Sequence, residues 1–408
     1  MDDKGDWRAG LREDWRSLAV ESWPAYLGAI LLLFLILLLL VKGGFWGIFG
    51  GLRLWGDWLN NLVGLGPALG IKPELEAPLA HRMSLLNLSI VAGALAAALL
   101  SRQFSLHRAP RLEYVWGALG GCLMGLGATL AGGCTTGGFF TPAMASSPAG
   151  WAMALGLMAG AWTGLKLLLW SLDHISWGMA APASVTLPQR PLPLLGLLLL
   201  VAAIACSVAW AKSDDERRAA LAGLIPIGFG MGLVMQRSRL CFARAFREPF
   251  MTGDGEMTRA ILLALAIGIP AAALMFQKKL ADPYDAIPAS FWLGSFSGGT
   301  IFGIGMIFAG GCASGALWRA GEGHLKLWVA LVFFAWSGST WYALLHRWGL
   351  LTRDSGDDNI DFTSLGRQAY LGDMLDGSLW ALAAGLGLLL LWYLWVRYNE
   401  ATEKFTVL

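Results

Sequence analysis

Long apolar stretches follow one another along most of the chain and are separated by short polar segments. Each is long enough, or nearly long enough, to cross a hydrocarbon core of about 30 Å as a helix. Two further segments, 43–65 and 221–246, are apolar but interrupted by glycine and charged residues, which is typical of backbone buried inside protein. The stretches predicted to span a membrane are 25–41, 85–100, 114–130, 151–172, 192–211, 260–275, 291–309, 327–345 and 379–396.

Composition supports a membrane protein. The chain of 408 residues is 56% hydrophobic and only 14% charged, whereas an ordinary globular domain has about 25% charged residues. Its 21 tryptophans suit a protein anchored at two membrane–water interfaces. The net charge of +2 provides no bulk positive field for nucleic acid. We therefore expect an all-α polytopic membrane protein of about nine transmembrane helices, with membrane lipid rather than nucleic acid as its surroundings.

Five parts are expected along the chain. Residues 1–23 form an interfacial amphipathic segment, because apolar residues from Trp7 to Leu18 recur at helical spacing with arginines between them. A frayed polar tail is the alternative. The remaining parts are a first transmembrane repeat at 24–190, a second at 191–346, a polar loop at 347–378, and a last transmembrane helix with its tail at 379–408.

The glycine-rich stretches 120–137 and 298–315 match one another without a gap. A shift of 178 residues gives nine identities in eighteen positions, and one of them pairs Cys134 with Cys312 in the same Ala-Gly-Gly-Cys frame. The abundance of glycine does not explain a cysteine in that frame. We therefore infer an internal duplication into two halves. Duplicated halves with interrupted segments at matching places are typical of transporters, whose substrate site lies between the halves.

Each Ala-Gly-Gly-Cys turn ends a glycine-rich helix and precedes small or hydroxylated residues. Glycine lets the backbone turn sharply and lets a solute approach, and backbone N–H groups freed at such a break attract an anion. Helix packing is the alternative for the glycines, but it does not explain a cysteine in both copies. The residues expected to line a substrate pathway are Gly132, Gly133, Cys134, Thr135, Thr136, Gly310, Gly311, Cys312, Ser314 and, in a third segment, Cys241.

The third segment runs from Gly228 to Glu248 and combines glycine breaks, four arginines and Cys241. Arginine at membrane depth faces a cavity or a partner. If this segment is helical, Arg237, Cys241 and Arg244 share one face. A positively charged loop is the alternative for the cluster, and an i,i+4 pair with Glu248 is the alternative for Arg244. The residues expected to attract an anion to one mouth of the pathway are Arg237, Arg239, Arg244 and Arg247.

The three cysteines also favour a particular kind of solute. A thiol is a soft, weakly hydrogen-bonding group, so it suits a solute whose exposed atom is sulfur or selenium better than chloride or phosphate. Cys122 and Cys206 are expected to be small core residues. Glu322 is interpreted as part of an interfacial salt bridge, with a proton carrier as the alternative. The five histidines lack metal-ligand spacing and no catalytic or cofactor motif is found, so no metal, cofactor or enzymatic activity is expected.

These motifs together resemble the YeeE/YedE sulfur-transport family, in particular its long YedE-like branch. The resemblance rests on AGGCTTGG at 131–138, AGGCASG at 309–315 and GFGMGLVMQRSRLCFARAFRE at 228–248. It implies a helical, pseudo-two-fold, hourglass-like fold in which central cysteines, here Cys134, Cys312 and Cys241, pass a sulfur anion along by hydrogen bonds. Shorter members of the family have a cysteine in the first interrupted segment, but residues 43–65 of this chain have none.

The sequence therefore predicts an importer of a small sulfur anion such as thiosulfate, or of a related selenium compound, in the cytoplasmic (inner) membrane of a bacterium. The resemblance also implies a small cytosolic sulfur-carrier protein of the TusA/SirA type as a partner. The alternative is a membrane component that transfers sulfur or selenium, or carries out redox chemistry, through a reactive cysteine persulfide.

Overall fold

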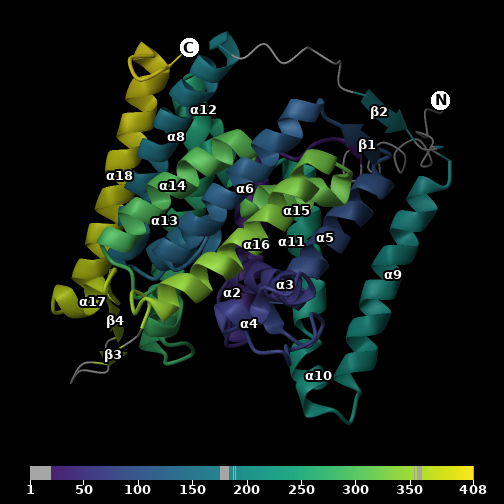
Figure 1. The fold of residues 1–408 in the computed structure, drawn as a ribbon. Coiled ribbons are helices and arrows are strands. Elements are labelled where there is room, and N and C mark those ends of the chain that lie inside the picture. The colour runs from purple at the N-terminus through teal and green to yellow at the C-terminus, as the bar shows by residue number, and fades with distance from the viewer. Residues whose placement is uncertain are drawn as a thin grey trace, which may run out of the picture.

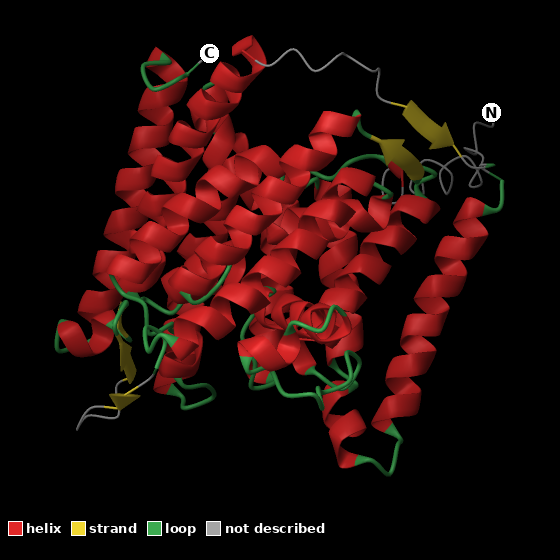
Figure 2. Cartoon of the chain, in the orientation of Figure 1, coloured by secondary structure: helices red, strands yellow, loops and turns green. Residues whose placement is uncertain are grey.

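The computed structural model describes residues 20–174, 183–186, 188, 190–352, 354–355 and 361–407. The interfacial segment expected at 1–23 therefore lies almost wholly outside the described residues. Within these ranges the chain is a helical bundle with a small antiparallel sheet near each of two opposite ends (Figures 1 and 2). The helices are α2 (Ala25–Val41), α3 (Phe49–Leu62), α4 (Gly66–Leu69), α5 (Arg82–Leu100), α6 (Arg111–Ala131), η2 (Thr135–Phe140), α7 (Thr141–Met144), α8 (Pro148–His174), α9 (Leu192–Ala211), α10 (Glu216–Leu221), α11 (Leu224–Ser238), α12 (Phe242–Met251), α13 (Glu256–Gln277), η3 (Pro283–Ala286), α14 (Leu293–Ala309), α15 (Ala313–Glu322), α16 (Leu325–Arg347), α17 (Leu371–Met374) and α18 (Ser378–Thr402).

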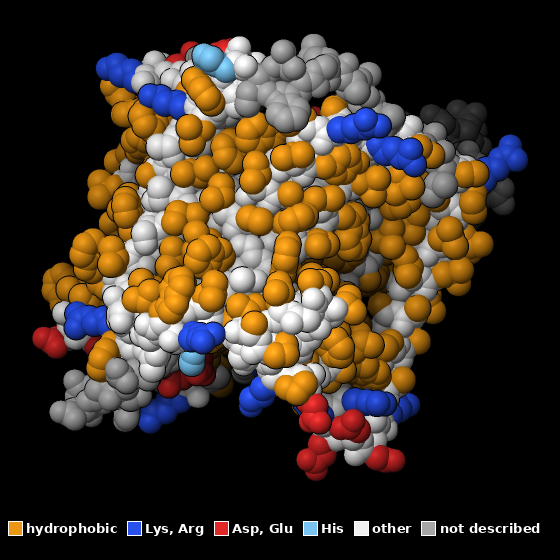
Figure 3. All heavy atoms as spheres, viewed as in Figure 1, with side chains coloured by type: hydrophobic (Ala, Val, Ile, Leu, Met, Phe, Trp, Pro, Cys, Tyr) orange, Lys and Arg blue, Asp and Glu red, His pale blue; other side chains and the backbone are white. Residues whose placement is uncertain are grey.

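The all-α membrane fold is confirmed. Nine helical segments of the described chain are long and apolar enough to cross a membrane. They differ from the expected nine at one place. Residues 216–251 qualify, whereas α2, with 17 residues, is shorter than every one of the nine. Apolar side chains cover the middle of the molecule, and charged side chains gather at its two ends (Figure 3). This distribution is that of a multi-pass membrane protein.

Helix α9 is the most exposed of these spans. It stands at the edge of the bundle and packs on α5 (Figure 1), and only 11% of its most apolar stretch is buried. Leucines such as Leu194 and Leu198 point outward, with 61% and 54% of their surface exposed, as expected for a helix that faces lipid. Cys206 lies on this helix and is exposed, so the expectation that it is a core residue is wrong.

The centre of the bundle is an antiparallel pair of glycine-rich helices, α6 and α14. A side chain on Gly305 would meet backbone atoms of Gly120 and Met124 at 2.7 Å, and one on Gly298 would meet the Gly127 carbonyl oxygen at 2.6 Å. Two helices can approach this closely only where both lack side chains. The glycines that the sequence repeat aligns thus form the contact between the two helices. Gly120 faces Gly305, which is the residue that the repeat aligns with Gly127.

Many contacts among the helices of α2–α8 and α11–α16 come in exchanged pairs. Helix α8 packs on α14 as α16 packs on α6, and α5 packs on α11 as α13 packs on α2. Likewise α3 contacts α16 while α12 contacts α8, and α15 contacts α5 while α7 contacts α13. Two copies facing each other across an approximate two-fold axis make this pattern, which supports the duplication that we propose.

The strands mark the two ends of the bundle. At one end β1 (Ser105–Arg108) pairs with β2 (Ala183–Thr186), just before α6 begins. At the other end β3 (Asp354–Ser355), β4 (Asp361–Thr363) and β5 (Gly366–Arg367) lie beside the start of α14, since the Gly294 N–H donates to the Leu365 carbonyl. The two Ala-Gly-Gly-Cys turns therefore lie toward opposite ends, each where its helix stops.

Candidate functional site

The first Ala-Gly-Gly-Cys turn stops α6 and starts the π-helical turn η2. Gly132 adopts a left-handed conformation, with φ 71° and ψ 10°, which glycine reaches without strain. Cys134 is extended and fully buried, and its carbonyl accepts from the Gly138 N–H at 2.7 Å. Its sulfur lies 3.1 Å from the Thr136 hydroxyl. The chain thus reverses at the glycine and holds the thiol beside a hydroxyl group.

The second turn repeats this conformation. Gly310 is left-handed, with φ 82° and ψ 13°, and Cys312 is extended at the start of α15. The sulfur of Cys312 lies 3.3 Å from the Ser314 hydroxyl and accepts from the Gly315 N–H at 3.4 Å. Both turns therefore place a buried thiol beside a hydroxyl two residues further on, at the start of a short helix.

Cys241 lies in the break between α11 and α12. Arg239 has a positive φ of 53°, which ends α11, and Cys241 begins α12 in an extended conformation. The expectation that Arg237, Cys241 and Arg244 share one helix face is therefore wrong, because the helix ends between the first two. Instead the turn brings the Cys241 thiol into contact with that of Cys312, and all five cysteines are free.

Gly315 makes the contact of the two thiols possible. A side chain there would meet the Cys241 sulfur at 2.7 Å and the Cys312 sulfur at 3.4 Å. In the first half, a side chain on Gly137 would meet the backbone of Gly47 at 3.3 Å. Gly47 therefore lies against Gly137 in the first half as Cys241 lies against Gly315 in the second. The three buried thiols belong to one core, and η2 contacts α15, but only the second half has a thiol pair.

The other expected pathway residues surround these thiols. Thr135 is fully buried, and its hydroxyl has no hydrogen-bond partner among the described residues. Gly133 must lack a side chain, because one would lie 2.6 Å from the Gly137 backbone. Gly311 differs, since a side chain there would meet nothing closer than 3.7 Å.

The four expected anion-attracting arginines have protein partners. Arg244 forms the i,i+4 ion pair with Glu248 at 2.6 Å, and Arg247 lies 3.9 Å from the same carboxylate. Arg237 is 3% exposed and donates to the Glu21 carbonyl. Arg239 pairs with Glu322, so that carboxylate forms a salt bridge as expected. These side chains thus brace the segment around Cys241.

A cavity lies against each Ala-Gly-Gly-Cys turn. One of about 340 Å³ reaches Gly132 and Gly133 and is lined by Ser290 and Thr363 at the end where β4 lies. The other, of about 290 Å³, reaches Gly310 and is lined by His107 and Arg108 of β1 at the opposite end. Cys134 therefore follows directly after two lining residues of one cavity, and Cys312 follows two residues after a lining residue of the other.

Sequence reasoning missed the charged lining of the second cavity. Arg319 and Lys326 were not predicted as site residues, and the histidines were considered only as possible metal ligands. The residues gather because β1 joins the end of α15, where the His107 N–H donates to the Gly323 carbonyl at 3.0 Å. That pairing spans more than two hundred residues, and no local pattern signals it.

Taken together, these features define a class: a multi-pass, all-α membrane protein with a cavity against each Ala-Gly-Gly-Cys turn. A family profile described as "Sulphur transport" matches residues 6–163 and 237–407. The chain therefore belongs to the sulphur-transport family, and the resemblance to YeeE/YedE proteins is confirmed.

Individual relatives agree with this assignment. The chain is 30% identical over 302 residues to "Probable transporter YedE" of Salmonella typhimurium, covering 71% of this chain and 73% of that protein. It is 41% identical over 112 residues to "Thiosulfate transporter TsuA" of Escherichia coli, covering 27% of this chain and 31% of that protein. The TsuA of Spirochaeta thermophila is 37% identical over 108 residues, covering 26% of this chain and 32% of that protein.

Proposed function

We propose that the protein imports a small sulfur anion such as thiosulfate, or a related selenium compound, across the bacterial cytoplasmic membrane. Membership of the sulphur-transport family and the similarity to proteins named thiosulfate transporters support this proposal. The observation that carries it is the position of the thiols. Cys134, Cys241 and Cys312 are fully buried, and each Ala-Gly-Gly-Cys turn, which carries Cys134 or Cys312, is reached by a cavity.

The thiols and their neighbours suit a sulfur solute. A thiol is a weak donor and a weak acceptor, so it exchanges a hydrogen bond with a terminal sulfur at little cost and solvates oxygen poorly. The hydroxyls of Thr136 and Ser314 lie within 3.3 Å of the sulfurs of Cys134 and Cys312 and orient them. We place Gly132, Gly133, Gly310, Gly311 and Thr135 along the same passage.

Uptake by purified protein in liposomes tests the proposal. Wild-type protein should accumulate radiolabelled thiosulfate, and Cys134→Ala and Cys312→Ala should each reduce the rate about tenfold or more. Cys206→Ala is the matched control, because its thiol is exposed on α9 and should leave uptake unchanged. Wild-type liposomes that accumulate neither thiosulfate nor the selenium analogue would overturn the proposal.

The contact between Cys241 and Cys312 favours a second candidate, sulfur transfer through a persulfide. One thiolate would attack the terminal sulfur of thiosulfate, form a persulfide and release sulfite, and a TusA/SirA-type carrier would take the sulfur. The double variant Cys241→Ser with Cys312→Ser separates the two functions, because it removes both thiols of the pair. A hydroxyl still donates a hydrogen bond, so passage persists at a reduced rate if thiols only solvate the anion, whereas persulfide formation is abolished. Mass spectrometry of the wild type during turnover would detect the modified cysteine.

A further inference from the structure

The cavity beside the second turn gathers positive charge from three elements that are distant in sequence. Arg108 comes from β1, Arg319 from α15 and Lys326 from α16. Glu113 is the carboxylate in its lining, and it already lies 3.3 Å from the Lys326 ammonium group. Among the described residues, neither Arg108 nor Arg319 forms an ion pair with a carboxylate, since Glu322 pairs with Arg239 and Glu113 with Lys326. The cavity therefore carries an excess of positive charge.

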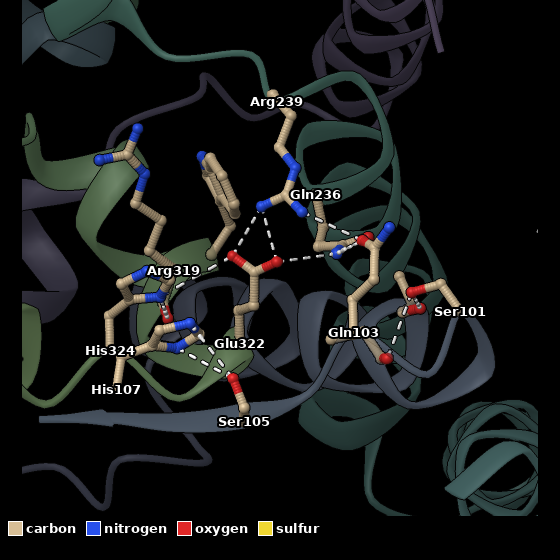
Figure 4. A network of polar contacts seen from close by, with 12 residues as sticks. Ser101, Gln103, Ser105, His107, Gln236, Arg239, Arg319, Glu322 and His324 are labelled. Atoms are coloured by element: carbon tan, nitrogen blue, oxygen red, sulfur yellow. Dashed lines mark hydrogen bonds and ion pairs between the residues drawn. The ribbon is translucent and has the colours of Figure 1, made fainter. Parts of the chain in front are cut away.

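Arg319 is held in place. Its Nη1 donates to the Gly310 carbonyl at 3.1 Å, and its guanidinium lies 5.2 Å from the centre of the Trp318 ring. In Figure 4 its side chain extends away from the Glu322 carboxylate. A guanidinium that uses one donor for the backbone keeps the rest of its fork for a ligand. Because Gly310 belongs to the turn that carries Cys312, such a ligand would lie next to the thiol region.

The wall of the cavity is stiff. The rings of His107 and His324 stack with centroids 4.2 Å apart and planes 10° from parallel. Both imidazole nitrogens of His107 lie within 3.3 Å of the Ser105 hydroxyl (Figure 4). The backbone bond from His107 to Gly323 ties this strand to the end of α15. A preformed wall lowers the ordering cost of binding a small ligand.

Glu322 does not neutralise Arg319, although it lies three residues further along the chain. Both of its oxygens accept from Arg239 Nη1, at 2.6 and 2.8 Å, and Gln236 donates to it at 3.3 Å (Figure 4). The carboxylate is 3% exposed and is not part of the cavity lining. Because Glu322 is paired with Arg239, its carboxylate does not compete with an incoming anion for the Arg319 guanidinium.

We propose that this cavity is an oxyanion vestibule, in which Arg108 and Arg319 bind a tetrahedral dianion such as sulfate or the sulfonate end of thiosulfate. Its role in uptake rests on the proposed function, but its binding of oxyanions does not. The guanidinium groups recognise oxygen, whereas the thiols recognise sulfur. Capture at this end therefore does not discriminate sulfate from thiosulfate, and selection takes place at Cys241 and Cys312.

Calorimetric titration of the purified full-length protein tests the vestibule, with sodium sulfate and sodium thiosulfate as separate ligands in chloride of constant ionic strength. We expect both anions to bind, and Arg319→Gln to weaken both about tenfold, as for the loss of a charge-assisted contact. Arg108→Gln should act in the same direction. Because Arg108 is exposed, its replacement leaves the turn intact and keeps the test decisive if Arg319→Gln unfolds. Arg102→Gln, an exposed arginine outside the cavity lining, is the control and should bind as wild type.

Each outcome separates the vestibule from the transport proposal. Unchanged binding in both Arg108→Gln and Arg319→Gln, or no heat beyond that of chloride exchange, overturns the vestibule. Cys312→Ala should bind sulfate like the wild type while losing thiosulfate uptake. Sulfate binding that depends on Arg319 in a protein that transports nothing would overturn the proposed function and leave the vestibule standing.

Discussion

Arg239 holds both carboxylate oxygens of Glu322, at 2.6 and 2.8 Å, across 83 residues of sequence. The pair ties the turn that precedes Cys241 to the end of α15, the helix that begins after Cys312. Between them the Trp318 indole donates to the Leu240 carbonyl at 3.0 Å. The thiol pair and the ion pair are thus two ends of one contact between the turn and α15.

Replacing Glu322 by glutamine should destabilise the protein. The change leaves the Arg239 charge without its partner, which costs about 3–5 kcal/mol for a fully buried pair. Since Arg239 is 38% exposed, we expect a smaller loss of about 2 kcal/mol. Thermal unfolding in detergent measures it. Arg218→Gln breaks the exposed pair with Asp215 and should change stability by less than about 0.5 kcal/mol. Equal effects of the two changes would contradict the coupling inferred for Glu322.

Gly315→Ala should separate the two thiols. The new methyl group would lie 2.7 Å from the Cys241 sulfur, so one of the two groups must move, at a cost of about 1–3 kcal/mol. Gly311→Ala is the matched control, because its nearest neighbour would be at 3.7 Å. Adding Cys241→Ala to Gly315→Ala should recover the melting temperature but not thiosulfate uptake. Failure of the double variant to recover stability would show that the steric conflict lies elsewhere.

His324 should remain neutral well below the usual pH. Burial lowers its pKa from 6.5 to about 4, and the nearby Glu322 carboxylate opposes the shift. The unfolded chain binds this proton more readily than the native protein, so the native state loses stability as pH falls from 6.5 toward 4. NMR of ¹³Cε1-labelled histidine follows the titration. In Glu322→Gln the pKa should fall further, and a rise would show that the carboxylate is not the opposing charge.

The two cavities should be accessible from opposite sides of the membrane. Gly47 lines the first cavity, and a side chain there would have ordinary contacts of 3.6 Å and more with Met83. Ala109 lines the second. In a Cys206→Ser background, a membrane-impermeant thiosulfonate reagent applied to one face of oriented vesicles should label only one of Gly47→Cys and Ala109→Cys. Labelling of both from the same face would rule out the arrangement of two opposed cavities.

The sequence predicted the scaffold well because its signals are local. The apolar length of each span and the glycines at 132 and 310 are sufficient to place helices and their ends within a few residues. The alignment of Cys134 with Cys312 also predicted that two buried thiols would occupy equivalent turns. Each of these features depends on residues that are neighbours in the chain.

The lining of the second cavity could not be predicted in this way. It depends on the stacking of His107 with His324 and on the ion pair between Arg239 and Glu322, both of which are tertiary contacts. Cys206 shows the same limit, because its apolar surroundings in sequence are typical of a lipid-facing helix as much as of a core. Hydropathy measures the polarity of a segment and does not distinguish lipid from protein as its neighbour.

The backbone contact between α6 and α14 restricts how this protein can move. With Gly120 against Gly305 and Gly127 against Gly298, the central helices meet backbone to backbone at these glycines, and a sliding or rocking motion would drive neighbouring side chains into the facing backbone. We expect the two helices to behave as a fixed spine. Any opening and closing during a transport cycle then falls to the short pieces around it, such as η2, α15 and the turn at Arg239, so that a few residues move while the bulk of the molecule stays at rest.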